Sequence, residues 1–195
     1  LWIYMEGGRG IMIYVTSDWH LNHNQPFIYQ SRGYNTVEEM NQAILERYNE
    51  IVTPDDTVYV LGDCLLGPIE GVQLLSQFNG HKILVAGNHC TDNRLAAYDQ
   101  AHIFEHMCMA MRLKYNGYSF YLSHYPTLTA NYDDKGLKQM TINLCGHIHT
   151  TDPFYHMKMG IMSYHVEVDA HDLRPISLDD IINDIKENKK QYGQL

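Results

Sequence analysis

Residues 82–90 read Lys-Ile-Leu-Val-Ala-Gly-Asn-His-Cys, an apolar run that ends in a glycine, an amide, an imidazole and a thiol. The aliphatic residues at 82–86 predict a short buried strand. Glycine allows the backbone to turn sharply at the end of that strand. Asn88 and His89 are therefore expected to project from a strand end, where the ligand sites of α/β proteins lie.

Four other apolar runs end in the same way. They cover residues 11–16, 57–61, 118–123 and 141–145, and they precede Asp18-Trp-His20, Gly62-Asp63, His124 and Gly146-His147-Ile-His149. Because the carboxyl ends of strands converge on one crevice in α/β sheets, we expect these polar groups to lie together. The expected cluster consists of Asp18, His20, Asp63, Asn88, His89, His124, His147 and His149.

The remaining patterns predict an α/β fold. Thr36-Val-Glu-Glu39 has the form of a capping box and predicts a helix that runs to about Val52. Asn116-Gly117 predicts a tight hairpin turn within 112–123. Early alternation of strands and helices, followed by a more β-rich half, predicts two sheets packed between helices. Further helices are expected at 69–78, at 92–101 and after a cap at Ser177, and a further strand at 164–168.

Length, charge and cysteine content limit the domain number, the partners and the location that we expect. The 195 residues suit one domain, expected over residues 12–195, with residues 1–11 as an N-terminal extension that does not resemble a signal peptide. A net charge of −9 argues against nucleic acid or an anionic membrane surface as a partner. The four cysteines form no CxxC pair, so we expect reduced thiols and a cytoplasmic protein. No run approaches the ~20 apolar residues of a membrane span.

The chemistry of the expected cluster suits divalent metal ions. Carboxylates and imidazoles together favour Mn, Fe, Zn or Ni, and the missing cysteine cluster argues against a structural zinc site. The D-x-H and H-x-H spacings are expected to place two ligands on the same side of an extended segment. Asp63 could bridge two ions. Two metals about 3.5–4 Å apart can clamp a phosphate and generate a hydroxide near neutral pH.

The ordered set of motifs resembles the calcineurin-like metallophosphoesterase superfamily. Its small bacterial and phage members are the most similar branch, and the resemblance extends over about residues 12–182. The family's fold is a four-layer α/β/β/α sandwich, which agrees with the expected order of strands and helices. Beyond the ligand motifs, the resemblance rests on residues 17–23, 37–40, 54–59, 123–126 and 174–178.

The resemblance also implies a role for each residue of the cluster. One metal would be held by Asp18, His20 and His149, and a second by Asn88, His124 and His147. Asp63 would bridge the two metals together with a water or hydroxide nucleophile. His89 would bind phosphate and protonate the leaving oxygen.

Three further residues have roles that the motifs leave open. His23 resembles a histidine of the small-phosphoesterase branch and either lines the site or lies in a loop. Arg32 either pairs with a phosphate oxygen or is a solvated loop arginine. Cys90 stands where the family usually has an acidic residue, which would orient His89, so we expect His89 to be a weaker general acid here.

These observations predict a metal-dependent phosphoric ester hydrolase that uses a metal-bound hydroxide. The chain lacks a large specificity region, which favours a small phosphate ester, and the motifs leave diester and monoester, native metal and oligomeric state open. One alternative is a nuclease of the same superfamily, which the acidic charge disfavours. Another is a catalytically weak protein-interaction scaffold; such scaffolds usually lose ligands, whereas the ligand set here is complete.

Overall fold

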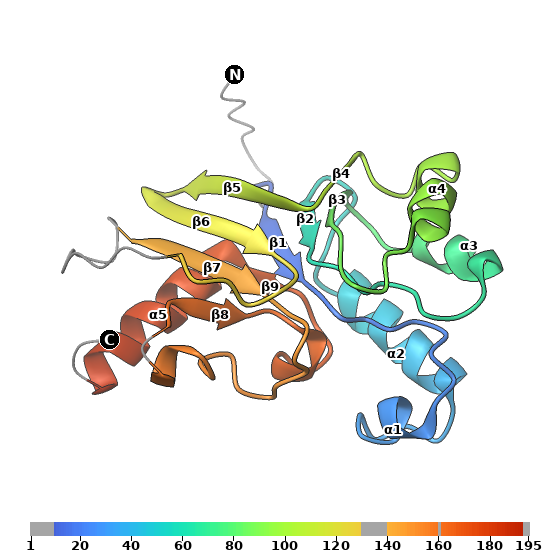
Figure 1. Ribbon diagram of the computed structural model, residues 1–195, viewed down its shortest axis with the longest axis horizontal. Helices are drawn as coiled ribbons and strands as arrows, with labels where there is room; N and C mark the ends of the chain where they lie inside the picture. The colour runs from blue at the N-terminus through green and yellow to red at the C-terminus, as the bar shows by residue number, and fades with distance from the viewer. Residues whose placement is uncertain (1–9, 130–139, 160, 193–195) are drawn as a thin grey trace.

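The computed structural model describes residues 10–129, 140–159 and 161–192. The predicted extension at 1–11 therefore falls almost entirely outside the described residues. Two sheets lie at the centre, with α2, α3 and α4 on one side of the molecule and α5 on the other (Figure 1). The predicted α/β class, with two mixed sheets flanked by helices, is confirmed.

The first sheet has five strands in the order β4-β3-β2-β1-β9. Strands β1 to β4 run parallel, and β9 is antiparallel to β1. The predicted strands at 11–16, 57–61 and 82–86 are confirmed to within two residues, whereas β4 and β9 have no counterpart among the predictions. The bounds are β1 Ile13–Thr16, β2 Thr57–Val60, β3 His81–Val85, β4 His106–Cys108 and β9 Ile176–Ser177.

The second sheet has four strands in the order β5-β6-β7-β8. β5 and β6 form the predicted hairpin, and both turn residues, Asn116 and Gly117, have positive φ as expected. The prediction of a strand at 164–168 is wrong beyond His165, because β8 ends there. Glu167 instead forms a bridge to Ser17, beside the other sheet. The bounds are β5 Ala110–Tyr115, β6 Tyr118–Ser123, β7 Thr141–Cys145 and β8 Ser163–His165.

The helices differ from their predictions mainly in length. Thr36 caps α2 by accepting a hydrogen bond from the Glu39 backbone, but the Glu39 carboxylate turns to the Asn35 N–H instead of back to Thr36. The helix predicted at 69–78 is instead two short pieces, η1 and α3. The bounds are α1 Pro26–Tyr29, α2 Val37–Asn49, η1 Ile69–Gly71, α3 Val72–Leu75, α4 Asp92–Gln100, η3 Met157–Met159, η4 Val168–Ala170 and α5 Leu178–Tyr192.

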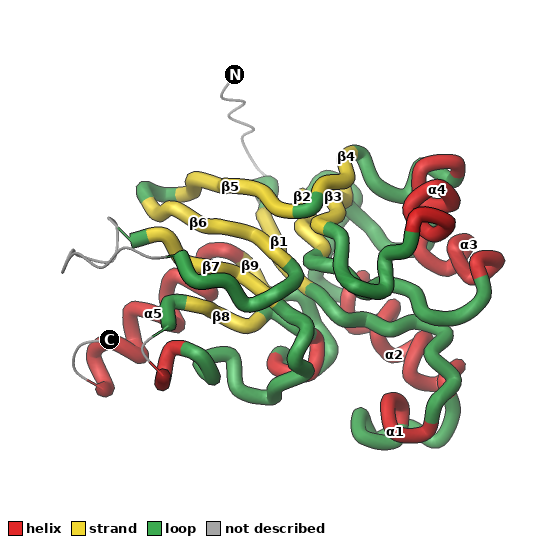
Figure 2. Tube along the Cα trace, in the orientation of Figure 1, coloured by secondary structure: helices red, strands yellow, loops and turns green. Residues whose placement is uncertain are grey.

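Two apolar cores hold the layers together. One lies between the first sheet and its helices and includes a stacked pair of rings, Trp19 on Phe78, with Tyr48 edge-on to both. The other joins the two sheets and contains four residues of α5: Leu178, Ile181, Ile182 and Ile185. Figure 2 shows the loops that follow the strands of both sheets. Among the described helices, none is long and apolar enough to cross a membrane.

Candidate metal centre

The polar residues of the five predicted motifs meet at the carboxyl ends of β1, β2, β3, β6 and β7. Backbone hydrogen bonds tie the loops after these strands together. The Asp18 N–H donates to Gly62 O at 3.2 Å, and the His20 N–H to Asp63 O at 2.9 Å. The Gly146 N–H donates to His124 O at 3.0 Å, which joins β6 and β7 at the same place. The expected convergence of strand ends is therefore present.

One group of three side chains directs its ligand atoms at a common point. His20 Nε2 and His149 Nε2 lie 3.0 Å apart. They lie 3.6 and 3.7 Å from Asp18 Oδ1. Adjacent ligand atoms that each lie about 2.0–2.2 Å from one cation are separated by roughly 3 Å. The spacing of Asp18, His20 and His149 suits one divalent cation.

A second group adjoins the first. His124 Nε2 lies 3.4 Å from Asp63 Oδ2, 2.7 Å from Asn88 Oδ1 and 3.2 Å from His147 Nδ1. His147 Nδ1 is 3.0 Å from Asn88 Oδ1. Asp63 Oδ2 is also 3.9 Å from His20 Nε2, so this carboxylate lies between the two groups. Asp18, Asp63 and His124 can themselves hold a cation.

The chemistry of these side chains fits bound cations. His124 Nδ1 donates to Leu61 O at 2.8 Å, so a neutral ring presents a lone pair from Nε2 to the Asn88 oxygen. Asp18 is fully buried, yet its Oδ1 has no hydrogen-bond partner, and neither has His20 Nδ1. A buried carboxylate oxygen without a partner is costly, and a cation would satisfy it together with the facing lone pairs.

The pKa shifts of His20, His147 and Asp18 favour the forms that bind metal, whereas the pKa of His149 is raised. Burial lowers the pKa of His20, and it also lowers the pKa of His147, where His124 adds to the effect. Burial opposes ionisation of Asp18, but His20, His124 and His149 together hold its pKa below the usual value. Neutral imidazoles beside ionised carboxylates are the forms that bind metal.

The backbone at the centre is left-handed at five of the candidate ligands. Asp18, His20, Asp63, His147 and His149 have φ of 58°, 51°, 50°, 79° and 53°. The sequence argument that D-x-H and H-x-H lie in extended segments is therefore wrong, because the chain turns at each strand end. His147 and His149 consequently face different groups. Such conformations cost about 1–3 kcal/mol each and cluster at functional sites.

A match to known proteins covers nearly the whole chain. Residues 11–193 match the family model described as calcineurin-like phosphoesterase. The chain belongs to the calcineurin-like phosphoesterase family. The resemblance seen in the motifs is thereby confirmed.

Similar proteins include two relatives by sequence and one solved structure that shares the fold. An uncharacterized protein of Methanocaldococcus jannaschii is 31% identical over 182 residues, which cover 91% of this chain and 93% of that protein. The gene 66 protein of Mycobacterium phage L5 is 27% identical over 90% of this chain and 96% of its own length. A solved structure of a protein of unknown function from Aquifex aeolicus has a TM-score of 0.67 at 23% identity, covering 89% of this chain and 99% of that chain.

The prediction that Arg32 pairs with a phosphate is wrong, and so is the alternative of a solvated loop. Its side chain is 3% exposed and makes a two-point ion pair with Asp169, at 2.8 and 2.9 Å. Its remaining donors reach Trp19 O, Asp18 O and the Met40 sulfur. The guanidinium therefore holds the loop that carries Asp18 and His20 through its backbone carbonyls, and it has no donor left for a substrate.

Asp169 is a residue of the candidate metal centre that the sequence analysis missed. Its Oδ2 lies 2.9 Å from His149 Nδ1, which leaves Nε2 of that ring directed at Asp18 and His20. Burial alone would lower the pKa of His149, yet the hydrogen bond to Asp169 raises it above its ordinary value. A carboxylate behind an imidazole in this way fixes the tautomer and orientation of a ligand.

His89 and His23 lie at the rim of the candidate metal centre. The His89 N–H donates to Asp63 Oδ1 at 3.0 Å, while its ring is 42% exposed and its Nε2 is 3.9 Å from Asp63 Oδ2. The His23 ring stacks 5.6 Å from that of His20, and burial lowers its pKa. Both rings are thus placed where a molecule bound at the centre would meet them.

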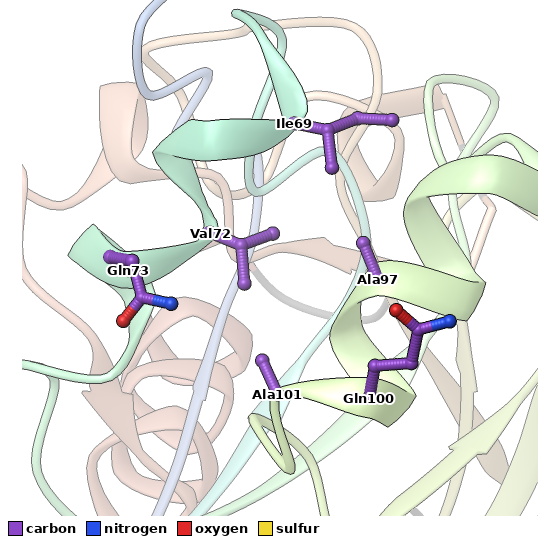
Figure 3. A pocket seen from close by; sticks show the side chains of 6 residues that line it. All are labelled: Ile69, Val72, Gln73, Ala97, Gln100 and Ala101. Carbon is purple, nitrogen blue, oxygen red and sulfur yellow. The ribbon is translucent and has the colours of Figure 1, made fainter.

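A separate pocket has η1 and α3 on one side and α4 on the other (Figure 3). None of its lining residues belongs to the two ligand groups, so this pocket is not part of the metal centre. It is lined by Ile69, Val72, Gln73, Ala97, Gln100 and Ala101.

Proposed function

We propose that this chain is a dinuclear-metal phosphoesterase that hydrolyses a small phosphate ester. The observation that carries the proposal is the pair of adjoining ligand groups with the Asp63 carboxylate between them. Asp18, His20 and His149 would hold one divalent ion, Asn88, His124 and His147 would hold the other, and Asp63 would be shared by both. Bound there, two divalent ions supply charge neutralisation of the phosphate and a water of lowered pKa.

In this proposal, residues of the protein orient the ligand rings, bind the phosphate and donate a proton. Leu61 O and Asp169 hold the rings of His124 and His149 in the orientation that directs each Nε2 at the centre. His89 binds a phosphate oxygen and donates a proton to the leaving oxygen, because its exposed ring faces the centre beside Asp63. His23 lines the same rim next to His20.

The experiment that tests the proposal measures metal content and turnover on the same preparation. Purified protein is expected to bind about two equivalents of a divalent metal such as Mn, as the paired ligand groups require. It should hydrolyse nitrophenyl phosphate esters, and a chelator should remove both metal and activity. Protein that binds no divalent metal and turns over neither the diester nor the monoester would refute the proposal and favour the scaffold alternative.

Replacing Asp169 by asparagine is expected to weaken metal binding about 10–100-fold near pH 8, because outer-shell partners of metal ligands have effects of this size. The carboxylate that raises the pKa of His149 would also be lost. A proton competes with metal for His149 Nε2, so metal is lost as pH falls through that pKa. Proton competition therefore sets in at a lower pH in the variant, so the difference in metal affinity between variant and wild type should narrow as pH falls.

Equilibrium metal binding across pH 5 to 8 measures both effects of the Asp169 variant. Asp172→Asn is the matched control, since Asp172 is 73% exposed and pairs with Arg47 and Arg174 at the surface. Equal metal affinity in the two variants would show that Asp169 does not position His149.

The neutral side chain at position 90 leads to a further prediction about His89, the proposed general acid. Burial raises the pKa of Cys90, so the thiol is neutral beside His89. Cys90→Asp is expected to speed hydrolysis of alkyl phosphate esters more than of nitrophenyl esters, because poor leaving groups depend most on protonation. Measuring kcat/KM for both ester types from pH 5 to 9 tests this, with Cys90→Ser as the neutral control. A variant that changes both ester types equally would show that residue 90 does not orient His89.

A further inference from the structure

An exposed aromatic ring stands at each end of the candidate metal centre. Tyr125 directly follows His124, and its ring lies 4.7 Å from that of His147 and 5.1 Å from that of His124. Phe27 lies at the other end, where its ring is 5.6 Å from that of His23, which stacks on His20. The ligand groups thus lie between the two aromatic rings.

Both rings are open to solvent. Tyr125 is 49% exposed and Phe27 is 67% exposed. The Tyr125 carbonyl accepts hydrogen bonds from Ser123 Oγ and Thr127 Oγ1, at 2.8 and 3.0 Å, which hold that loop in place. Phe27 is part of α1. Rings presented in this way are platforms on which planar groups stack.

The charges around the centre favour a substrate with a single negative charge on phosphorus. Among the described residues, Arg32 and Arg94 contact residues of the site, and both donate to protein oxygens there. Arg32 is committed to Asp169, and Arg94 donates to His89 O and Leu66 O at 2.9 and 2.8 Å. Arg94 Nε has no hydrogen-bond partner but is buried, so neither arginine offers an accessible donor for the second charge of a monoester, and the chain carries a net charge of −9.

We infer that the substrate is a phosphodiester with a planar ring on each of its two arms. The inference rests on the phosphoesterase function proposed above. With phosphate at the ligand groups, one arm packs on Tyr125 and the other on Phe27. Diaryl phosphates and dinucleoside monophosphates have this chemistry. Water adds to phosphorus, the P–O bond to one arm breaks, and that oxygen takes a proton, giving a monoester and an alcohol or phenol.

Inert anions test the inference without a chemical step. Diphenylphosphinate and dimethylphosphinate carry the same single charge, and only the first has two rings. Calorimetry and inhibition of the Mn-loaded protein are expected to show tighter binding of the diphenyl compound, by about tenfold or more for each ring. In Tyr125→Ala and in Phe27→Ala this preference should fall about tenfold, and in the double variant it should disappear.

Tyr155→Ala is the control for removing an exposed ring. Tyr155 is 41% exposed, but its ring contacts are with His156 and His165, outside the ligand groups. The preference should be unchanged in this variant. If Tyr125→Ala and Phe27→Ala keep the wild-type preference while nitrophenyl esters are still hydrolysed, the ring inference is wrong and the proposed function stands. If the protein neither binds metal nor hydrolyses any ester, both fail.

Discussion

Asp63→Asn is expected to reduce phosphoesterase activity by more than about 100-fold and to lower the amount of bound metal. Changes to residues behind metal ligands already cost 10–100-fold, so loss of a bridging ligand should exceed that range. The carboxylate is 2% exposed and lies 3.4 Å from His124 Nε2 and 3.9 Å from His20 Nε2. Its charge is placed where two cations would otherwise repel each other.

Asparagine tests the charge of Asp63 while it preserves the turn. The Asn Oδ1 can still accept the hydrogen bond that Asp63 Oδ1 takes from the His89 N–H. The measurements are kcat/KM with a nitrophenyl diester, metal content by elemental analysis, and the melting temperature as a check on folding. Asp99→Asn on the exposed side of α4 is the matched control. Normal turnover and full metal content in Asp63→Asn would contradict the bridging role.

Gly146→Ala is expected to have an effect of similar size although it changes no ligand. A Cβ at this position would lie 2.1 Å from Asp18 Oδ2 and 2.2 Å from Ser17 Oγ. Either Asp18 must move or the loop after β7 must shift, and Asp18 Oδ2 also accepts the hydrogen bond from the His147 N–H. Displacements near 1 Å at a reacting site can cost about 100-fold in rate.

Metal affinity and kcat/KM measure the effect of Gly146→Ala. Gly10→Ala is the control, because a Cβ there meets no atom within 4 Å. Gly87→Ala is a second variant of the same kind, since its Cβ would lie 2.3 Å from Asp63 Oδ1. Wild-type metal affinity and activity in both site variants would show that close approach of the backbone is not what shapes the centre.

The sequence alone determined the fold class and which residues gather at the strand ends. Runs of four to six residues make the five strands that precede the motifs, and the polar groups directly after them lie at one edge because neighbouring strands among these are parallel. The Asn116-Gly117 turn and the Thr36 cap were also predictable, since both depend on neighbouring residues. These features are local, because each depends only on residues that are close together in the sequence.

Tertiary structure decided the orientation of the side chains at the candidate metal centre. Arg32 and Asp169 are 137 positions apart, and no motif marks either one as a partner of the other. The left-handed backbone at Asp18, His147 and His149 was likewise unforeseen, because aspartate and histidine carry no requirement for positive φ. That conformation is imposed by hydrogen bonds between loops, such as those from the His20 and Gly146 N–H groups. Such constraints exist only after both sheets have packed, which is the physical reason that sequence patterns identified the candidate ligands but not the residues that orient them.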